Sequence, residues 1–346
     1  MYKKLIGSFL SFLGLVMACE SVHEIKLPAL PPRLVMNMVY NQDSLLKVNL
    51  SRTIQDLGNY YYTQDSSYFD RFFVDNAKIT WWINEKEAGE LQKTEGRGNY
   101  TGSGNNLSAG DRITFQAEVP DYEPVKGETF IPYPSPVLEV DTQSVKSSVE
   151  WVRKDYWDIK LDIRFQDQPN VRNYYMISFK NRIDYTYHGE PVSYYWVRAD
   201  IYHEEDLLFE HEGYFRFSQD MYISYNQWNP TYSFLFTDET IDGKETLLNF
   251  HIKNTEASFS SDTLSLENRW TIEFYNLSES YYLYFRSKAL QYDQNDFFWD
   301  LGLREPMPTY TNVKGGYGLV SALQKESFDF TTPETDEVPP IYEEDY

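Results

Sequence analysis

Apolar residues alternate with polar residues in many short runs of this sequence, and this period of two constrains the fold more than any other feature. The runs cover residues 46–51, 77–84, 113–119, 159–165, 175–179, 248–252 and 270–274. A period of two places one face of a strand in a core and the other in water. Aromatic residues make up 17% of the chain, and they fit the half-buried surface of a pleated sheet. We therefore predict an all-β fold.

A proline-rich segment divides this pattern into two parts. Pro132, Pro134 and Pro136 occupy every second position of residues 131–136, so the segment has few N–H donors for a sheet. We predict an N-terminal immunoglobulin-like sandwich over residues 33–130, a linker over 131–136, and a larger antiparallel β-sandwich domain with one helix over 137–330. Asp242 and Gly243 lie between two apolar runs and predict a tight hairpin turn.

Two segments near the carboxyl end depart from the alternation. From Ser278 to Gln291, a serine that can cap a helix is followed by apolar residues at spacings of three and four, including Tyr281 and Phe285. This pattern predicts a helix near 278–291 beside the second sheet. Residues 331–346 follow the last predicted strand and are rich in acids and prolines, which predicts a disordered tail.

The first residues have the pattern of a lipoprotein signal. Lys3 and Lys4 precede an apolar stretch that is too short to span a bilayer as a helix. Ala18 then stands immediately before Cys19, the single cysteine of the chain. We predict a signal peptide over residues 1–18, lipid attachment to Cys19, and a proline-containing tether over 19–32. The alternative is an ordinary secretory signal with an incidental cysteine.

The charge of the chain excludes some partners. It has 31 basic and 53 acidic residues and a formal net charge of −22. A polyphosphate partner needs a basic face, so we expect no binding to nucleic acid. An anionic membrane also repels an acidic domain that lies flat on it. The negative charge is therefore consistent with a domain that a tether holds away from the bilayer.

The sequence contains no familiar catalytic or metal-binding motif. His203 and His211 could face each other in a hairpin, but no third histidine lies near them, and zinc sites need three or four ligands. The segment 293–296 lacks the glycine and the glutamate of a calcium loop. A solvated acidic hairpin and a surface turn account for these two segments. We predict no catalytic residues, no metal and no cofactor, and hence no enzyme.

Outward-facing aromatic residues are the best candidates for binding. Trp82 falls on the polar face of its strand, Tyr61 lies in a tyrosine-rich loop, and Tyr195 and Trp196 lie in a Tyr-Tyr-Trp run. Such side chains can stack on sugars or anchor a protein interface. The alternative for each is ordinary packing on a sheet or within a loop.

Several short motifs, taken in order, resemble one family of lipoproteins. They are Cys19-Glu20 with Ile25, Leu50-Ser51-Arg52-Thr53, Phe165-Gln166-Asp167-Gln168-Pro169, Asn173-Tyr174-Tyr175, Phe236-Thr237-Asp238, Asp242-Gly243-Lys244, Leu277-Ser278, Glu305-Pro306 and the segment 310–318. Together they resemble the Bacteroidota lipoproteins grouped as domain of unknown function 4249, over nearly the whole mature chain. The resemblance implies association with outer-membrane TonB-dependent receptors and carries no catalytic residues.

These observations predict a non-enzymatic outer-membrane lipoprotein that assists a TonB-dependent receptor in nutrient capture and uptake. Glu20 follows the anchor where inner-membrane lipoproteins often have Asp. We therefore expect the outer membrane, on the cell surface or on its periplasmic face. The alternative is a free-standing surface glycan-binding lipoprotein. A hydrolase is a third hypothesis, and it requires a pocket of carboxylates with raised pKa values.

Overall fold

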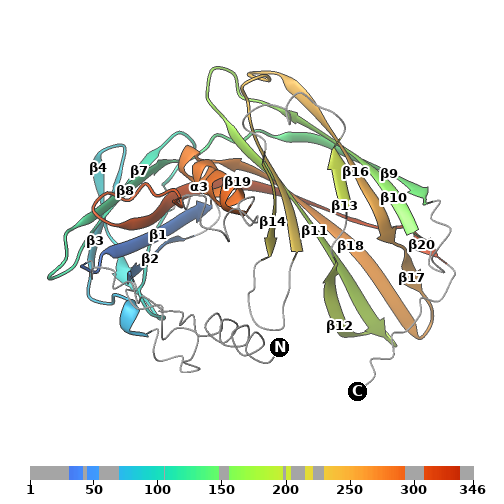
Figure 1. Ribbon diagram of the computed structural model, residues 1–346, viewed down its shortest axis with the longest axis horizontal. Coiled ribbons are helices and arrows are strands. Elements are labelled where there is room, and N and C mark those ends of the chain that lie inside the picture. The colour runs from blue at the N-terminus through green and yellow to red at the C-terminus, as the bar shows by residue number, and fades with distance from the viewer. Residues whose placement is uncertain are drawn as a thin grey trace, which may run out of the picture.

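The computed structural model describes residues 31–41, 45–53, 70–104, 106–147, 156–197, 200–203, 215–220, 230–292 and 308–335. Within these residues the chain forms three β-sheets and one α-helix, and the sheets pack as two sandwiches (Figure 1). The predicted all-β fold with a helix in its second part is therefore confirmed. In the part of the chain described here, no helix is long and apolar enough to cross a membrane.

One twelve-stranded sheet runs through both sandwiches, with the order β14-β15-β11-β18-β19-β1-β2-β6-β5 along its main path. Its strands are β1 (Leu34–Asn41), β2 (Leu46–Arg52), β5 (Gln92–Lys93), β6 (Asn99–Gly102), β11 (Tyr174–Tyr187), β12 (Glu190–Val197), β14 (Phe215–Asp220), β15 (Pro230–Thr237), β17 (Ser258–Ser260), β18 (Leu264–Leu277), β19 (Tyr317–Thr331) and β20 (Glu334–Thr335). Two smaller sheets cover the two ends of this long sheet.

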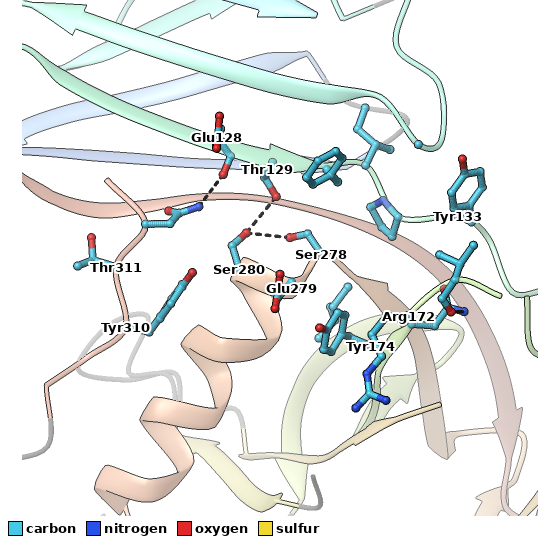
Figure 2. A pocket seen from close by; sticks show the side chains of 18 of the residues that line it. Glu128, Thr129, Tyr133, Arg172, Tyr174, Ser278, Glu279, Ser280, Tyr310 and Thr311 are labelled. Carbon is cyan, nitrogen blue, oxygen red and sulfur yellow. Dashed lines mark hydrogen bonds between the residues drawn. The ribbon is translucent and has the colours of Figure 1, made fainter. Parts of the chain in front are cut away.

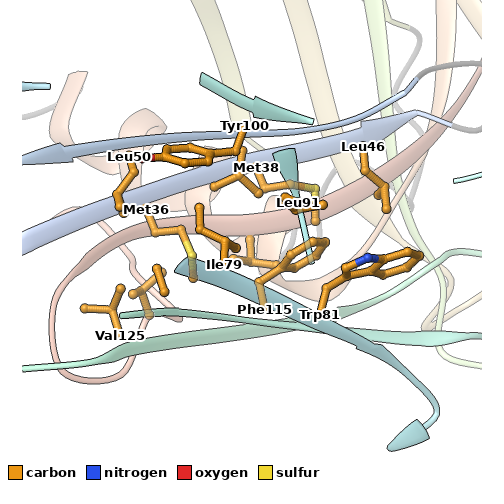
Figure 3. Close-up of a cluster of buried hydrophobic side chains, with 14 of the residues drawn as sticks. Met36, Met38, Leu46, Leu50, Ile79, Trp81, Leu91, Tyr100, Phe115 and Val125 are labelled. Carbon is orange, nitrogen blue, oxygen red and sulfur yellow. The ribbon is translucent and has the colours of Figure 1, made fainter. Parts of the chain in front are cut away.

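The N-terminal sandwich is closed by the sheet of β4 (Lys86–Glu90), β3 (Lys78–Ile83), β7 (Arg112–Glu118) and β8 (Val125–Phe130). Side chains at alternate positions meet between the layers, and Ile79, Trp81 and Phe115 lie there against Met36 and Met38 of β1 (Figure 3). The rings of Trp81 and Phe115 are stacked, with centroids 6.2 Å apart. The period of two thus places Trp81 inside the core, while its neighbour points to the outer face.

The C-terminal sandwich is closed by the sheet of β13 (Asp200–His203), β16 (Glu245–Glu256), β10 (Tyr156–Gln166) and β9 (Val137–Lys146). Its core contains a group of packed rings, in which Phe165 contacts both Tyr175 and Phe274, at centroid distances of 5.2 and 4.9 Å. Edge-on and tilted contacts of this kind are the favoured arrangement of aromatic pairs. The residues that precede this sandwich, 131–136, belong to no strand.

Strand β19 belongs to both sandwiches. Its residues 317–323 pair in parallel with β1, and its residues 323–331 pair antiparallel with β18 on the other edge. Val320 and Ala322 lie in the N-terminal core, while Phe328 and Phe330 pack against the C-terminal core. A strand from the far end of the sequence therefore completes the N-terminal sandwich.

Helix α3 (Glu279–Tyr292) lies on the outer face of the long sheet, near the point where β19 passes between the sandwiches (Figure 1). The hydroxyl oxygen of Ser278 accepts a hydrogen bond from the backbone N–H of Tyr281 at 3.4 Å, so this serine caps the helix. Phe285 and Ala289 pack with Leu323 of β19. The helix lies within two residues of its predicted position.

Two details differ from the sequence-based expectations. The prediction of a hairpin at Asp242 and Gly243 is wrong, because β15 and β16 on either side belong to different sheets. The turn instead carries the chain from one layer of the sandwich to the other, and a local turn signal cannot distinguish these two cases. The predicted tail begins at residue 331, but Thr331 ends β19, and Glu334 and Thr335 form β20, which pairs with β17.

Candidate functional site

An open cleft of about 620 Å³ lies where the two sandwiches meet, at the amino-terminal end of α3 (Figure 2). Four segments form its walls: the end of β8, the entrance to β11, the start of α3 and the segment before β19. Its lining residues are Gly110, 128–133, 171–174, 277–280 and 310–314. We call this site the junction cleft. Ligand sites favour such boundaries between packed units, so it is the leading candidate.

One wall of the junction cleft is held by three buried hydroxyl groups (Figure 2). Ser280 donates a hydrogen bond to the carbonyl of Val320 at 2.9 Å. Its oxygen lies 3.0 Å from the hydroxyl oxygen of Thr129 and 3.1 Å from that of Ser278. Because the proton of Ser280 is already used, Thr129 and Ser278 both donate to it. The start of α3 is thereby tied to β8 and β19.

Asn312 fastens the segment before β19 to the same wall. Its amide nitrogen donates to the carbonyls of Glu128 and Val320 at 2.8 and 2.7 Å, and its amide oxygen accepts from the N–H of Val320 at 2.9 Å. The side chain thus replaces ladder hydrogen bonds between β8 and β19. The walls of the cleft are held in place before any ligand binds, which reduces the ordering cost of binding.

A polar group at the rim combines Tyr174, Glu279 and Arg172. Burial, and then the neighbouring Glu279, raise the pKa of Tyr174 to about 12. Tyr174 is therefore a neutral phenol near pH 7, able to donate and accept hydrogen bonds. Arg172 forms ion pairs with Glu239 at 3.2 Å and with Asp238 at 3.5 Å. These ion pairs hold its guanidinium beside the cleft.

Apolar side chains at the mouth of the junction cleft face solvent. Phe130 is 58% exposed, Tyr133 39% and Val171 37%. Large apolar side chains that gather at a concave site indicate a ligand or partner with apolar surface. The cleft therefore offers flat apolar contacts at its mouth and hydrogen-bonding groups inside.

A second hollow, of about 350 Å³, lies on the outer face of the N-terminal sandwich. Trp82, Arg112 and Lys126 line it, and so does Glu128, which also lines the junction cleft. We call it the Trp82 hollow. Arg112 forms an ion pair with Glu85 at its edge. The shared Glu128 makes the two hollows neighbours.

Three carboxylates gather below the Arg172 side of the cleft. Oxygen atoms of Asp167, Asp238 and Asp242 lie within 4.8 Å of one another. Asp167 accepts from the N–H of Gly243 at 2.7 Å, and Asp238 accepts from the N–H of Asn173 at 2.6 Å. A calcium ion takes six to eight oxygen ligands, whereas here backbone N–H groups already engage the carboxylates. The cluster joins the entrance of β11 to the turn between β15 and β16.

The same cluster contains a carboxyl group of altered acidity. Burial, together with the like charges of Asp167 and Asp242, raises the pKa of Asp238, while hydrogen bonding from Asn173 and the charge of Arg172 oppose this shift. Asp238 is almost fully buried. Repulsion between these like charges destabilises the folded state where the two loops meet, and the positive charge of Arg172 offsets part of this repulsion.

The structure separates the aromatic candidates from one another. Trp82 lines its own hollow beside the junction cleft. Tyr195 and Trp196 lie on β12 and line neither hollow. Tyr195 stacks on Tyr185 with centroids 5.6 Å apart, and the guanidinium of Arg182 lies 5.9 Å from the ring centroid of Trp196. Tyr195 and Trp196 therefore pack on the sheet as well as facing water.

Other candidates lie outside the described residues. These are Cys19, Tyr61, His211 and the segment 293–296. His203 is the last residue of β13, and its ring packs edge-on against Phe234 with centroids 6.0 Å apart.

A family model described as Domain of unknown function (DUF4249) matches residues 20–329. The chain belongs to this family. A search of curated protein sequences finds no match. The match agrees with the resemblance of the sequence motifs to domain of unknown function 4249.

Solved structures show only distant similarity to this DUF4249 protein. One is a protein from Corynebacterium diphtheriae described as membrane anchored, with 10% identity, 73% of this chain and 56% of that chain covered, and a TM-score of 0.21. The major pilin SpaD of the same species is 11% identical, with 57% of this chain and 56% of that chain covered and a TM-score of 0.21. BcpA, the major pilin subunit of Bacillus cereus, is 10% identical, with 71% of this chain and 64% of that chain covered and a TM-score of 0.16. This chain thus spans little more than half of the first two proteins.

Sequence reasoning missed the junction cleft because its residues are scattered along the chain. Thr129, Tyr174, Ser280 and Asn312 come from four segments that only the fold brings together. A signal was nevertheless present in the DUF4249 motifs. The segments 173–175, 277–278 and 310–318 all contribute to the cleft, and the segments 165–169, 236–238 and 242–244 meet at the carboxylate cluster below it.

Proposed function

We propose that this DUF4249 protein is a non-enzymatic lipoprotein that assists an outer-membrane TonB-dependent receptor in capturing and admitting a nutrient. In this proposal, Cys19 carries the lipid, the tether holds the two sandwiches away from the outer membrane, and the junction cleft receives the nutrient. Placement on the cell surface follows from capture of an external nutrient, and the periplasmic face is the alternative.

One observation supports this proposal more than any other. The junction cleft combines exposed apolar side chains at its mouth with hydrogen-bonding groups that the fold holds in place, among them the buried hydroxyls of Thr129, Ser278 and Ser280. Catalysis of hydrolysis by carboxylates needs an acid or base with a pKa near the working pH. Among the groups that line the cleft, Tyr174 has a pKa raised to about 12 by burial, so near pH 7 it is a neutral phenol suited to hydrogen bonding. These properties favour binding over chemistry.

The proposal is tested by identifying what accompanies the protein in its native membrane. We expect gentle detergent extraction, followed by purification and mass spectrometry, to recover a TonB-dependent barrel in stoichiometric amount. A Cys19→Ser variant is the control, because it removes the lipid anchor and leaves the described fold unchanged. If the intact lipoprotein is recovered alone under mild conditions, the accessory role is wrong.

A second function is favoured by one feature, the partly buried indole of Trp82 that lines its own hollow. A free-standing surface glycan-binding lipoprotein would use such a ring to stack on sugars. This alternative requires binding by the isolated protein with no barrel present. The accessory role would be favoured if the barrel is recovered with the lipoprotein and if the isolated lipoprotein, without the barrel, binds no ligand.

A further inference from the structure

The junction cleft and the Trp82 hollow lie along one face of the N-terminal sandwich. Trp82, Thr114 and Glu128 are directly opposite one another on β3, β7 and β8, so their side chains form a row across the sheet. Phe130 is the next residue of β8 on the same face, and it stands at the mouth of the junction cleft. The row therefore leads from one hollow into the other.

Two lysines face each other between the hollows. Lys126 of β8 and Lys314 form an antiparallel bridge and exchange both backbone hydrogen bonds, at 3.0 and 2.7 Å. Directly opposite residues of such a pair project from the same face. Lys126 lines the Trp82 hollow and Lys314 lines the junction cleft. Two positive charges thus stand side by side at the boundary of the two sites.

No acid of the described residues neutralises the charges of this lysine pair. Across the described residues, no carboxylate oxygen lies within 4.0 Å of either ammonium group, although acids outnumber bases 53 to 31. Like charges that are directly opposite destabilise a sheet. A bound anion would relieve this repulsion, so the pair has the charge complementary to an anionic ligand.

The surroundings of the lysine pair specify more than charge. Trp82 lines the hollow that contains Lys126, and Phe130 and Tyr133 line the cleft that contains Lys314, all as flat rings near polar groups. Glu128 lines both, and its carboxylate can accept hydrogen bonds from hydroxyl groups. A sugar chain has apolar ring faces and many hydroxyl groups, whereas a simple anion has neither.

We propose that the Trp82 hollow and the junction cleft form one track for an acidic oligosaccharide. Sugar rings stack on Trp82 and Tyr133, and a carboxylate of the sugar chain lies between Lys126 and Lys314. The inference rests on the proposed capture function, for which it names the class of nutrient.

Calorimetric titration of the full chain in detergent tests the ligand class with three probes. They are a hexamer of galacturonic acid, the same hexamer with every carboxyl methyl-esterified, and a hexaglutamate peptide. We expect the acidic hexamer to bind, and the ester and the peptide to bind at least about tenfold more weakly. Equal binding of the ester would overturn the role of the lysines, and equal binding of the peptide would overturn the assignment to sugar.

Variants locate the binding on the surface. Trp82→Ala is expected to weaken binding of the acidic hexamer by about thirtyfold, as for a central aromatic contact. Lys126→Gln and Lys314→Gln are each expected to weaken it by about two- to fivefold. Lys78→Gln is the matched control, because Lys78 lies on the same sheet and pairs with Glu90 at 3.0 Å. Equal effects of Lys78→Gln and Lys314→Gln would overturn the proposed track.

Failure of this inference is distinguishable from failure of the proposed function. If none of the probes binds but the barrel is recovered with the lipoprotein, the acidic glycan is excluded and the accessory role stands. If the acidic hexamer binds but no barrel is recovered, the ligand class stands and the free-standing alternative replaces the accessory role.

Discussion

The two sandwiches differ in how they complete their cores. Among the described residues, every buried member of the C-terminal core comes from the segment 159–274, so that sandwich is closed by its own part of the chain. The N-terminal core includes Val313, Val320 and Ala322, which come from the far end of the sequence. The C-terminal sandwich is thus self-contained, whereas the N-terminal sandwich depends on a strand that it shares.

The composition of the cores follows the same division. In the part of the chain that the structure describes, eight of the 17 buried residues in the C-terminal core are aromatic, against four of 21 in the N-terminal core. Packed ring pairs add about 0.5–1.5 kcal/mol each beyond the area they bury. Contacts between aromatic rings therefore stabilise the C-terminal sandwich more than the N-terminal sandwich.

Separating the two sandwiches should have the largest effect. We expect residues 137–335 alone to fold, and residues 33–136 alone to remain unfolded, because the latter lack the parallel partner of β1. Circular dichroism and thermal melting of the two fragments test this. A third fragment, with residues 308–331 joined to 33–136, is the control and should recover structure. A cooperative melt of 33–136 by itself would contradict the dependence.

A charge placed within the first half of β19 should destabilise the N-terminal sandwich more than the C-terminal one. Val320 is fully buried, and Val320→Asp should lower the free energy of unfolding by about 4 kcal/mol or more. Hydrogen exchange should then lose protection over residues 34–130 before residues 156–187. Tyr317→Asp adds the same charge at an exposed position of β19 and should cost about 0.5 kcal/mol. Simultaneous loss in both sandwiches would mean that they unfold as one unit.

A buried carboxylate of β18 gives a smaller, pH-dependent effect. Glu273 forms ion pairs with Lys180 at 2.6 Å and with Lys325 at 2.7 Å. Burial opposes ionisation, but these lysines and Tyr275 outweigh it and lower the pKa of Glu273 to about 2. A lowered folded-state pKa means that this stability is present above pH 4.5 and is lost as the pH falls towards 2.

Glu273→Gln should therefore lower the free energy of unfolding by about 3 kcal/mol at pH 7, and the difference from the parent should shrink below pH 4.5. Chemical denaturation at pH 7, 4 and 3 measures this. Glu326→Gln is the control, because burial raises the pKa of Glu326 and its removal should cost no stability at pH 7. A constant deficit for Glu273→Gln at every pH would show that shape, and not charge, is what the substitution removed.

The sequence predicted those features that depend on short-range patterns. The alternation in residues 77–84 placed Trp81 inside and Trp82 outside, and Ser278 marked the start of α3. Residues 113–119 gave a buried strand for the same reason. Each of these patterns lies within one strand or helix, so it can be interpreted without knowing which elements pair in the fold.

Long-range pairing was not predictable in the same way. Nothing in the segment 317–331 indicates that its first half pairs with residues near position 35, because both partners have ordinary strand patterns. The hairpin prediction at Asp242 and Gly243 was wrong for the same reason, because the sequence does not show that β15 and β16 pair in different sheets. The junction cleft depends on these pairings. Of the aromatic candidates in the described part of the chain, only Trp82 lies close to it.

The parallel pairing of β1 with β19 also fixes an order of events in time. The N–H of Leu319 bonds to the side chain of Asn37 across 282 residues of sequence, and contacts of such separation form slowly. Strand β1 can complete its pairing only after β19, which is synthesised much later, has left the ribosome. Until then the edge of β1 stays open, and open edges pair with other chains. The half of the molecule that is made first is therefore finished last, and it is the half most exposed to aggregation while the protein folds.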